Sequence, residues 1–392
     1  MKETPVILND DLHFLVICCQ VALTTKDYQY IQNYLHHRTD IELKILIKKA
    51  NQHAIIPLIY KTLSNINDVP PLLLSRLKKH YIYTVQKNIL MTTEIIRIMK
   101  LLEDNSIEAL AFKGPVLSHM AYGDITLRQY SDLDILIDEI DTYTAGKLMS
   151  KNGHIPLLPL SILSNKVCLK TAKDFSLMSK GGVHTELHWR LFEKKYNISL
   201  LSCIHEQKCQ SVSINGNTIK TLQNELLLVY LCLHGAKHTF ERIEWICDID
   251  RLIRTHDIDW DITLLLAKQS HSNRAFFLGL ALAKELMHTP FADKVADQLH
   301  TREIKELKNL VRQHISNTHK EKSAFTHNRD TFLFQSKLFD KKSDMLQFYL
   351  STFFHISTND CQTFRLPKQL KFLYIILRPL RLLFSYTSRL FN

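Results

Sequence analysis

The sequence predicts an α+β protein in which a small mixed β-sheet is flanked by N-terminal and C-terminal helical regions. Glycine occurs only nine times in 392 residues, fewer than the turns of a barrel or sandwich usually need. Hydrophobic residues make up 45% of the chain, which supports two or three packed units and excludes a disordered protein. Short strand-like runs occupy the middle of the chain, between helical patterns.

The first region, residues 1–105, is expected to be helical. Asn9 or Asp10 can cap a first helix within NDDLHFLVICCQ. Apolar residues recur at helical spacing in IELKILIKKANQHAIIPLIYKTL and again in TVQKNILMTTEIIRIMKLLEDN. Because no catalytic pattern occurs there, we interpret this region as a helical support.

Residues 106–221 are expected to form a compact α/β unit. It begins with a strand in IEALAF, a short helix in VLSHMAYG and a second strand in SDLDILI. A helix follows in DEIDTYTAGKLMSKNG, closed by Gly153. Two hairpins complete the unit. DFSLMSK pairs with VHTELHWRL across Gly181 and Gly182, and SVSI pairs with TIKTL across the Asn215-Gly216 turn.

Helices return in residues 222–345, in the stretches NELLLVYLCLHGAKHTF, IEWICDIDRLIRTH and ITLLLAKQS. Residues 301–345 are charged and poor in apolar side chains, which predicts a solvated helix or a flexible connector. Residues 346–392 are interpreted as a C-terminal segment that ends in a basic amphipathic tail.

The cysteines and the apolar patterning indicate a cytoplasmic protein. Eight cysteines occur without a C-x-x-C pair, which favours reduced thiols over a structural zinc site. The first residues lack the basic region and long apolar run of a signal peptide. No stretch reaches the ~18 uninterrupted apolar residues of a membrane span.

The positive charge is concentrated in the tail. The formal net charge is +11, and residues 367–392 carry five cations without an Asp or Glu. The rest of the chain is close to balanced for its length, so a nucleic-acid partner is less favoured. The tail fits a helix packed on the body, a peripheral contact with the inner face of a membrane, or, less well, nucleic acid.

Two carboxylates in SDLDILI are the first candidate site. Side chains of a strand alternate between its faces, so Asp132 and Asp134 point the same way while Leu133 and Ile135 point into a core. Adjacent carboxylates repel each other unless a cation lies between them, and Mg²⁺ prefers carboxylate oxygens. The alternative is a solvent-exposed strand face that carries two charges.

A third carboxylate lies in VHTELHWRL. Glu186 shares a strand face with His184 and His188, and a neighbouring strand would place it beside the two aspartates. Such a triad can hold metal ions for phosphoryl or nucleotidyl transfer, and Glu186 can also accept a proton from the acceptor hydroxyl. The alternatives are an exposed strand Glu and, less favoured, a zinc site in His184-x-Glu186-x-His188.

The KGP turn before the first short helix is a candidate phosphate site. Gly114 follows a strand and Pro115 suits a first helical turn, where free amides attract anions. Lys113 would add positive charge there. A strand-Gly-helix turn is common, so the signal is weak alone. Arg128, just before the acidic strand, either pairs with Asp132 or reaches a triphosphate.

A cluster in HGAKH lies in the later helices. His234 and His238 are four residues apart on one helix face, with Lys237 beside them. The zinc-protease pattern needs Glu directly after the first His, and Gly235 stands there, which excludes that interpretation. Two alternatives remain: a helix–helix contact, or a face that closes over a nucleotide.

These motifs together resemble the uncharacterised nucleotidyltransferase family of the polymerase-beta-type superfamily. The resemblance rests on AFKGPVLSHMAYGDITLRQYSDLDILI, HTELHWRL and HGAKHTFERIEWICDIDRLI, in that order, and covers roughly residues 85–260. It implies that residues 106–221 form a nucleotidyltransferase core. It also implies that Asp132, Asp134 and Glu186 are catalytic ligands of Mg²⁺ or Mn²⁺, with Gly114 and Lys113 beside the phosphates.

The implied reaction transfers a nucleoside monophosphate from a triphosphate, such as ATP, to a hydroxyl or phosphate acceptor and releases pyrophosphate. The expected nucleotide-binding residues are Lys113, Gly114, Arg128, His188, His234, Lys237 and His238. One departure concerns the phosphate turn, which is Lys-Gly-Pro rather than the usual Gly-Ser or Gly-Gly. The acceptor is a small molecule, glycan, peptide or protein. The alternatives are an RNA-modifying enzyme and a non-catalytic nucleotide-binding module.

Overall fold

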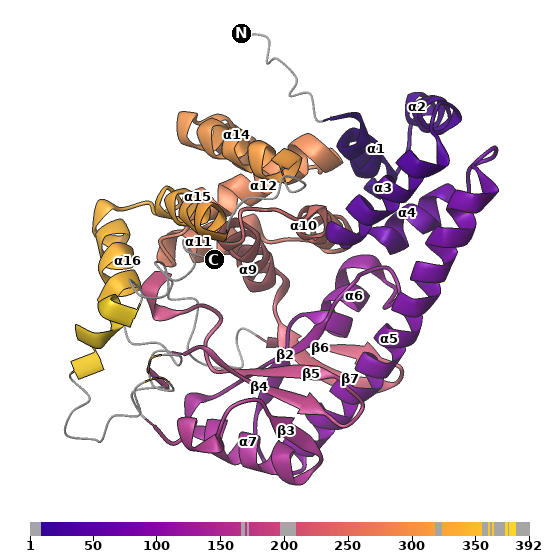
Figure 1. Cartoon of the computed structure of the whole chain (residues 1–392). Coiled ribbons are helices and arrows are strands. Elements are labelled where there is room, and N and C mark those ends of the chain that lie inside the picture. The colour runs from indigo at the N-terminus through magenta and orange to yellow at the C-terminus, as the bar shows by residue number, and fades with distance from the viewer. Residues whose placement is uncertain are drawn as a thin grey trace.

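The computed structural model describes residues 9–165, 169–170, 172–196, 209–317, 324–354, 360, 363, 373–374 and 376–381. Figure 1 shows the first helices at one end of the long helix α5 (Pro71–Glu103) and the β-sheet beside its other end. The later helices lie on the opposite side of the molecule from α5. This arrangement is the α+β fold that the sequence predicts, with a small mixed sheet between helical regions.

The N-terminal helices begin at polar caps. They are α1 (Asp10–Cys19), α2 (Thr25–His36), α3 (Asp40–Gln52), α4 (Ile56–Leu63) and α5. The Asn9 side chain accepts a hydrogen bond from the Leu12 amide at 2.9 Å, which confirms the predicted cap. Thr24 and Thr39 each form a capping box with the acidic residue three positions later.

Five strands form the central sheet. They are β1 (Ala109–Ala111), β2 (Asp132–Ile137), β3 (His154–Pro156), β4 (Asp174–Ser179) and β5 (His184–His188), in the order β1-β2-β5-β4-β3. The β2 and β5 strands are parallel, and the other neighbours are antiparallel. The parallel register sets Asp132 beside His184, and Asp134 beside Glu186. The strand β3 was not predicted, because it is only three residues long and ends in a proline.

The predicted turns of the α/β unit are present. The helix α6 (Gly114–Tyr122) ends at Gly123, and α7 (Thr142–Lys151) follows the 3₁₀ turn η1 (Glu139–Asp141). A separate hairpin joins β6 (Cys209–Ile214) to β7 (Asn217–Leu222). Asn215 and Gly216 both have positive φ, 51° and 76°, as a type I′ turn requires.

The chain returns to helices after β7. They are α9 (Asn224–Lys237), α10 (Ile243–Thr255), α11 (Trp260–Gln269), α12 (Asn273–Met287), α13 (Asp293–Ala296), η5 (Asp297–His300), α14 (Arg302–Asn317), α15 (Ala324–Ser336) and α16 (Lys342–Phe354). Ten residues of α9 are buried, so this helix is central to the C-terminal half. One continuous hydrophobic core runs from α1 through the sheet to α15.

The prediction of a solvated helix or flexible connector for residues 301–345 was wrong for α14. Its apolar residues are few but are spaced on one face: Ile304, Leu307, Val311 and Ile315 are all buried. That face packs on the C-terminal helices, where α14 contacts α12. A low apolar content therefore concealed an amphipathic helix.

The basic tail is only partly within the described residues. Arg378 and Arg381 each form an ion pair at 2.6 Å with the fully buried carboxylate of Asp360. Two of the five tail cations therefore share one acid outside the tail, whose single negative charge offsets one of their two positive charges. The other three, Lys368, Lys371 and Arg389, lie outside the described residues. Within the described part of the chain, no helix is long and apolar enough to cross a membrane.

Candidate active site

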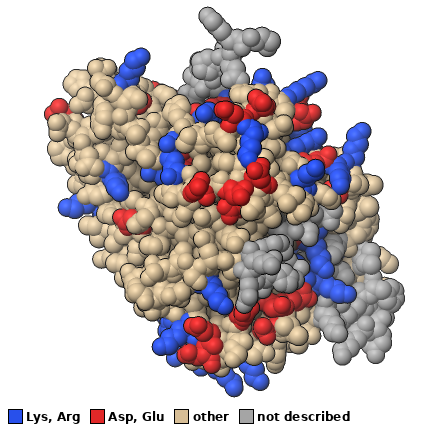
Figure 2. Space-filling view, turned by 180° about the vertical axis from the view of Figure 1, so that it is seen from behind, with Lys and Arg blue, Asp and Glu red and all other residues tan. Residues whose placement is uncertain are grey.

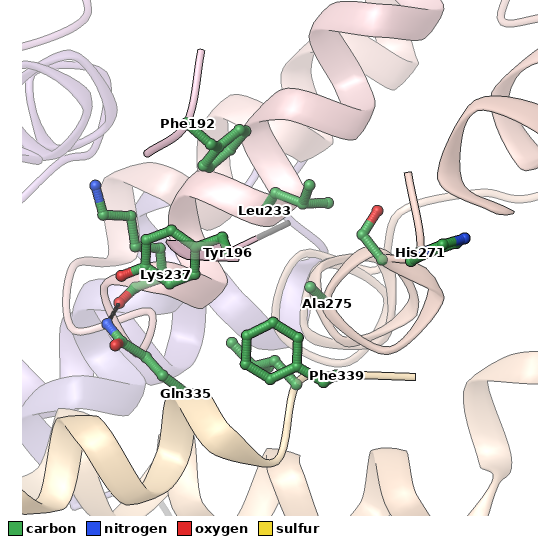
Figure 3. A pocket seen from close by; sticks show the side chains of 10 residues that line it. Phe192, Tyr196, Leu233, Lys237, His271, Ala275, Gln335 and Phe339 are labelled. Atoms are coloured by element: carbon green, nitrogen blue, oxygen red, sulfur yellow. Dashed lines mark hydrogen bonds between the residues drawn. The ribbon is translucent and has the colours of Figure 1, made fainter. Parts of the chain in front are cut away.

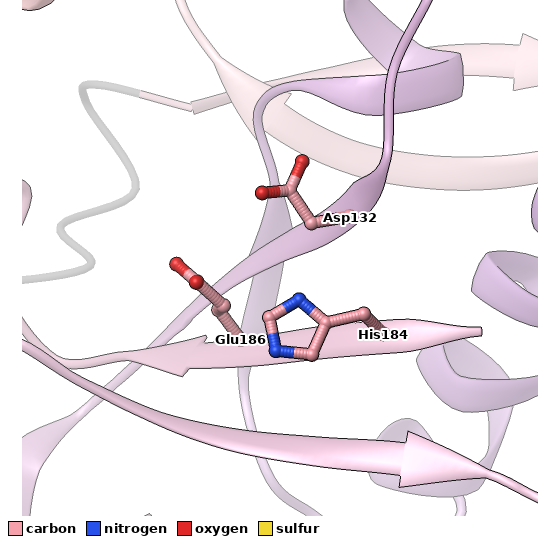
Figure 4. Close-up of side chains that lie close together, drawn as sticks. All are labelled: Asp132, His184 and Glu186. Atoms are coloured by element: carbon pink, nitrogen blue, oxygen red, sulfur yellow. The ribbon is translucent and has the colours of Figure 1, made fainter. Parts of the chain in front are cut away.

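The acidic residues of β2 and β5 converge on one face of the sheet. Alternation along β2 places Asp132 and Asp134 on this face, and the parallel neighbour β5 adds His184, Glu186 and His188. Potential ligand atoms of Asp132, His184 and Glu186 lie within 4.8 Å of one another, and those of Asp134, Glu186 and His188 form a second such group. Figure 4 shows the first group, with Asp132 from β2 above the β5 pair.

The opposite side chains of both strands are buried, as predicted. Leu133, Ile135 and Ile137 of β2 and Thr185 and Leu187 of β5 are almost inaccessible to solvent. Burial of this apolar face fixes the register, because a slip by one residue would turn every acid into the core. The packing of the sheet therefore holds the carboxylates together.

Asp134 lies at the centre of the cluster. Its side chain is 1% exposed, and Oδ1 is 2.9 Å from His188 Nε2 and 3.3 Å from Lys113 Nζ. Burial opposes ionisation of this carboxyl, but Lys113 and His188 outweigh it and lower its pKa. The other oxygen, Oδ2, is buried and has no hydrogen-bond partner in the part of the chain that the structure describes. An ionised, buried oxygen without a partner fits a bound cation.

Glu186 joins the two groups. Its Oε2 lies 3.2 Å from His188 Nε2 and 3.9 Å from Lys173 Nζ. Burial alone would raise the pKa of Glu186, but the hydrogen bond and charge of His188 and the charge of Lys173 outweigh burial and lower the pKa to about 2. The carboxylate is therefore ionised at neutral pH. This state suits a metal ligand better than a proton acceptor. The neighbouring Asp132 differs, because burial and the charge of Asp134 raise its pKa.

His188 bridges two carboxylates through one nitrogen. Burial and the charge of Lys173 oppose its protonation, but Asp134 and Glu186 outweigh them and raise its pKa. The two histidines of His184-x-Glu186-x-His188 fall in different ligand groups. The geometry therefore does not favour the alternative in which both histidines bind one zinc ion.

Two site residues were missed by the sequence analysis. Lys173, just before β4, forms an ion pair with Asp174, and its Nζ lies 3.5 Å from His188 Nδ1. Tyr230 of α9 presents its ring 5.6 Å from Lys113 Nζ. Lys173 reaches the site because Asp174 lies opposite His188 in the β4–β5 register, which the sequence does not specify.

The KGP turn lies against the acidic strand. Gly114 has φ +55°, and a Cβ there would lie 3.3 Å from the Asp132 carbonyl oxygen. Glycine is therefore required both by the left-handed backbone and by the close approach to β2. Lys113 caps α6, and its amine points to Asp134 rather than into solvent. Pro115 lies in the first helical turn, as predicted.

Arg128 is paired with Asp248, not with Asp132 as one alternative held. Its Nε and Nη2 donate to the Asp248 carboxylate at 2.9 to 3.1 Å, and both side chains are buried. Tyr122 donates to the same carboxylate at 2.8 Å. Asn88 of α5 donates to the Arg128 carbonyl oxygen at 2.8 Å. This network joins α5, α6 and α10 behind the acidic strand, and a contact of Arg128 with a triphosphate stays a prediction.

The HGAKH residues form a helix–helix contact. The rings of His234 and His238 lie 5.6 and 5.4 Å from the ring of Trp245 on α10. Burial lowers the pKa of both histidines, that of His238 to about 3, and the nearby lysines add to the effect. Both imidazoles are therefore neutral. Gly235 between them leaves room for the Phe240 ring, which a Cβ would meet at 2.2 Å.

Lys237 of the same motif forms an ion pair with Glu193 at 3.0 Å. It also borders a mostly apolar pocket between α9, α12 and the α15 segment, drawn in Figure 3. The pocket is lined by Phe192, Tyr196, Leu233, Lys237, His271, Ser272, Ala275, Gln335, Leu338 and Phe339. Lys237 thus faces this pocket, whereas His234 contacts Tyr230, the residue beside Lys113, with 3.5 Å between Tyr230 Oη and His234 Nδ1. A role of the motif in nucleotide binding stays a prediction.

A family comparison now adds to this geometry. The model of a family described as uncharacterised nucleotidyltransferase matches residues 39–288. The chain belongs to this family. The matched range runs from the N-cap of α3 to the C-cap of α12, well beyond the residues 85–260 on which the resemblance rested. The flanking helices α3 to α5 and α9 to α12 are therefore part of the family's common unit.

Other comparisons add little. The chain is similar to a crystal structure of an antigenic nucleotidyltransferase-like protein from Paracoccidioides brasiliensis, with 16% sequence identity. That similarity covers 52% of this chain and 94% of the other, and its TM-score of 0.31 is too low to establish a shared fold. None of the curated proteins matches the chain. Family membership alone supports a general role in nucleotidyl transfer.

Glu244, beside the Arg128–Asp248 pair, gives a pH-dependent prediction. Burial raises the pKa of Glu244, the charge of Arg128 lowers it, and the charge of Asp248 raises it again. The net result is a pKa of about 8. Its ordinary value is 4.5, so between about pH 5 and 8 the folded state retains a proton that the unfolded chain releases. Stability is therefore lost as pH rises through this window.

We expect Glu244→Gln, which cannot ionise, to gain at least ~1 kcal/mol over the wild type between pH 5 and pH 9. Urea unfolding at pH 5, 7 and 9 measures this difference. An equal pH response of the two proteins would show that Glu244 titrates normally. Glu225→Gln, on the partly exposed first turn of α9, is the control.

Proposed function

We propose that this protein is a metal-dependent nucleotidyltransferase that moves a nucleoside monophosphate from a triphosphate, such as ATP, to a hydroxyl or phosphate acceptor. The observation that carries the proposal is the convergence of Asp132, Asp134 and Glu186 on one sheet face, with a buried Asp134 oxygen that has no hydrogen-bond partner among the described residues. Family membership supports the same chemistry.

The residues divide the work as follows. Asp132, Asp134 and Glu186 would hold Mg²⁺ or Mn²⁺, which supplies charge neutralisation for the phosphates. The acceptor oxygen, which releases its proton to solvent when the acceptor is a hydroxyl, forms a bond to the α-phosphorus. The bond from that phosphorus to the bridging oxygen breaks, and pyrophosphate leaves. Lys113 at the KGP turn and the amides of the first turn of α6 lie where they favour an anion beside the acids. His188 and Lys173 keep Asp134 and Glu186 ionised.

A panel of ATP, GTP, CTP and UTP, each with Mg²⁺ or Mn²⁺, tests the proposal by thermal shift. Ligand at 100 times its dissociation constant stabilises a protein by about 2.7 kcal/mol. We expect at least one triphosphate to raise the melting temperature only with metal, and Asp132→Asn with Asp134→Asn to abolish the effect. Asp138→Asn, at an exposed helix cap, should keep it. The proposal fails if no triphosphate stabilises the wild type.

The acceptor decides between the remaining alternatives. An RNA acceptor requires a basic groove beside the acids. On the face shown in Figure 2, acidic and basic side chains are interspersed, which does not favour RNA there. Turnover of a bound triphosphate separates an enzyme from a non-catalytic nucleotide-binding module.

The location of the protein stays part of the proposal. We propose a cytoplasmic protein whose residues 367–392 contact an anionic membrane surface from the inner side. The pairing of Arg378 and Arg381 with Asp360 weakens this proposal, because one of their two charges is offset and both side chains are directed to a carboxylate of the protein. Co-sedimentation with anionic liposomes, with and without residues 367–392, tests it.

A further inference from the structure

The outer ligand group differs from the inner one in how its members are partnered. In the inner group, His188 contacts both Asp134 and Glu186, and Lys113 lies 3.3 Å from Asp134. In the outer group, the side chains of Asp132 and His184 make no hydrogen bond or ion pair with any residue that the structure describes. Two convergent, half-buried ligands thus have no polar side-chain partner among the described residues.

The backbone holds these ligands side by side. Asp132 and His184 are register partners on parallel strands, one residue pair before Asp134 and Glu186. Their potential ligand atoms and that of Glu186 lie within 4.8 Å of one another (Figure 4). Strands fix ligand positions more closely than loops do, so the group is preorganised. The buried, unpartnered Oδ2 of Asp134 on the same face is an independent sign that a cation belongs here.

The ligand types indicate which cation. Two carboxylates and an imidazole form a mixed oxygen and nitrogen set. Mg²⁺ keeps to oxygen ligands, whereas an imidazole nitrogen favours first-row transition ions, of which Mn²⁺ is the weakest binder and the one that shares the preference of Mg²⁺ for carboxylates. We propose that Asp132, His184 and Glu186 form an outer metal site in which His184 is a direct ligand, so that the site prefers Mn²⁺ to Mg²⁺.

This inference rests on the proposed function for its catalytic meaning, but not for its test. It identifies His184 as a residue that selects the metal at the nucleotide site. Glu186 belongs to both groups, so the outer ion and the inner carboxylates share one ligand. The family's acidic triad accounts for the carboxylates, whereas the choice of metal depends on the imidazole of this chain.

Metal binding to the full chain without nucleotide tests the proposal. Mn²⁺ is titrated and followed by electron paramagnetic resonance, and pulsed measurements detect coupling to a directly bound ¹⁴N. We expect ¹⁴N coupling in the wild type and its loss in His184→Gln, with Mn²⁺ affinity reduced at least tenfold. His80→Gln, an exposed histidine of α5, is the matched control. The Mg²⁺ affinity of His184→Gln, measured by competition with Mn²⁺, should differ from that of the wild type by less than threefold.

Three further arms make the outcome decisive. His188→Gln should retain the ¹⁴N signal. If the signal is lost in His188→Gln and kept in His184→Gln, the assignment of His184 as the ligand is overturned. His184→Asp should restore affinity and shift the preference towards Mg²⁺, which a purely structural role of His184 would not do. If the wild type shows ¹⁴N coupling but no triphosphate raises its melting temperature, the metal site is supported and the proposed function is contradicted. If a triphosphate raises the melting temperature but His184→Gln binds Mn²⁺ as tightly as the wild type does, the proposed function is supported and the role of His184 is contradicted.

Discussion

Replacing Asp134 by Asn is expected to lower the rate of nucleotidyl transfer at least ~10³-fold, because metal neutralisation of transition-state charge is worth several kcal/mol and 1.4 kcal/mol is tenfold in rate. Asn keeps the shape of the side chain but removes the charge that a metal ion needs. The change also leaves Lys113 and the bridging His188 without their shared carboxylate oxygen. Release of pyrophosphate and transfer of α-³²P label to acceptor fractions measure the effect.

Two controls separate chemistry from folding. Asp138→Asn, one residue beyond the end of β2, should retain wild-type activity because its side chain only caps η1. Asp132→Asn removes a less buried carboxylate and should fold more readily, with a similar loss of transfer. An Asp134→Asn protein that is folded by circular dichroism and keeps more than a tenth of the wild-type rate would contradict the assignment of this carboxylate.

The acidic strand was predictable because its information is local. The alternation of SDLDILI alone places Asp132 and Asp134 on one face, and the structure confirms that geometry. The hairpin across Gly181 and Gly182 likewise placed Glu186 on a strand, although its pairing with β2 required a neighbour further away in the chain. Local rules of alternation and turn chemistry were sufficient for both.

The partners of the site were not predictable, because they depend on register and on distant packing. Proximity in sequence offered Asp132 as one of two alternative partners of Arg128, the other being a triphosphate, yet Arg128 pairs with Asp248, 120 positions away. The same holds for Tyr230, which reaches Lys113 from α9. Charged residues in a buried interface choose partners by three-dimensional packing, and no local pattern records that choice.

The family's helical regions explain why such distant pairs matter. The acidic strand has one face on the site and the other in the core, so it depends on helices from both ends of the chain for burial. Arg128 follows α6, Asp248 lies on α10, and Asn88 on α5 holds the Arg128 backbone. The ion pair therefore joins the two helical flanks just behind Asp132. Removal of one partner would therefore leave a buried charge unpaired between these helices.

Asp248→Ala is accordingly expected to lower the free energy of unfolding by about 3–5 kcal/mol, the usual cost of leaving a buried charge without its partner. Arg128 is 7% exposed and Asp248 0%, so water cannot replace the lost carboxylate. Tyr122 loses its acceptor in the same variant. Urea unfolding at neutral pH measures the change. Asp261→Ala, whose ion pair with Lys294 is exposed, should cost no more than about 1 kcal/mol.

A variant that lacks both charges shows whether the cost comes from the unpaired charge. Arg128→Met combined with Asp248→Leu removes both charges and keeps apolar volume, and such replacements of buried pairs are often neutral. We therefore expect the double variant to be more stable than Asp248→Ala by at least about 2 kcal/mol. If the two variants are equally unstable, the loss comes from the packing around Tyr122 and α10 rather than from the isolated guanidinium. In that case the ion pair would be a consequence of the packing between the flanks and not its cause.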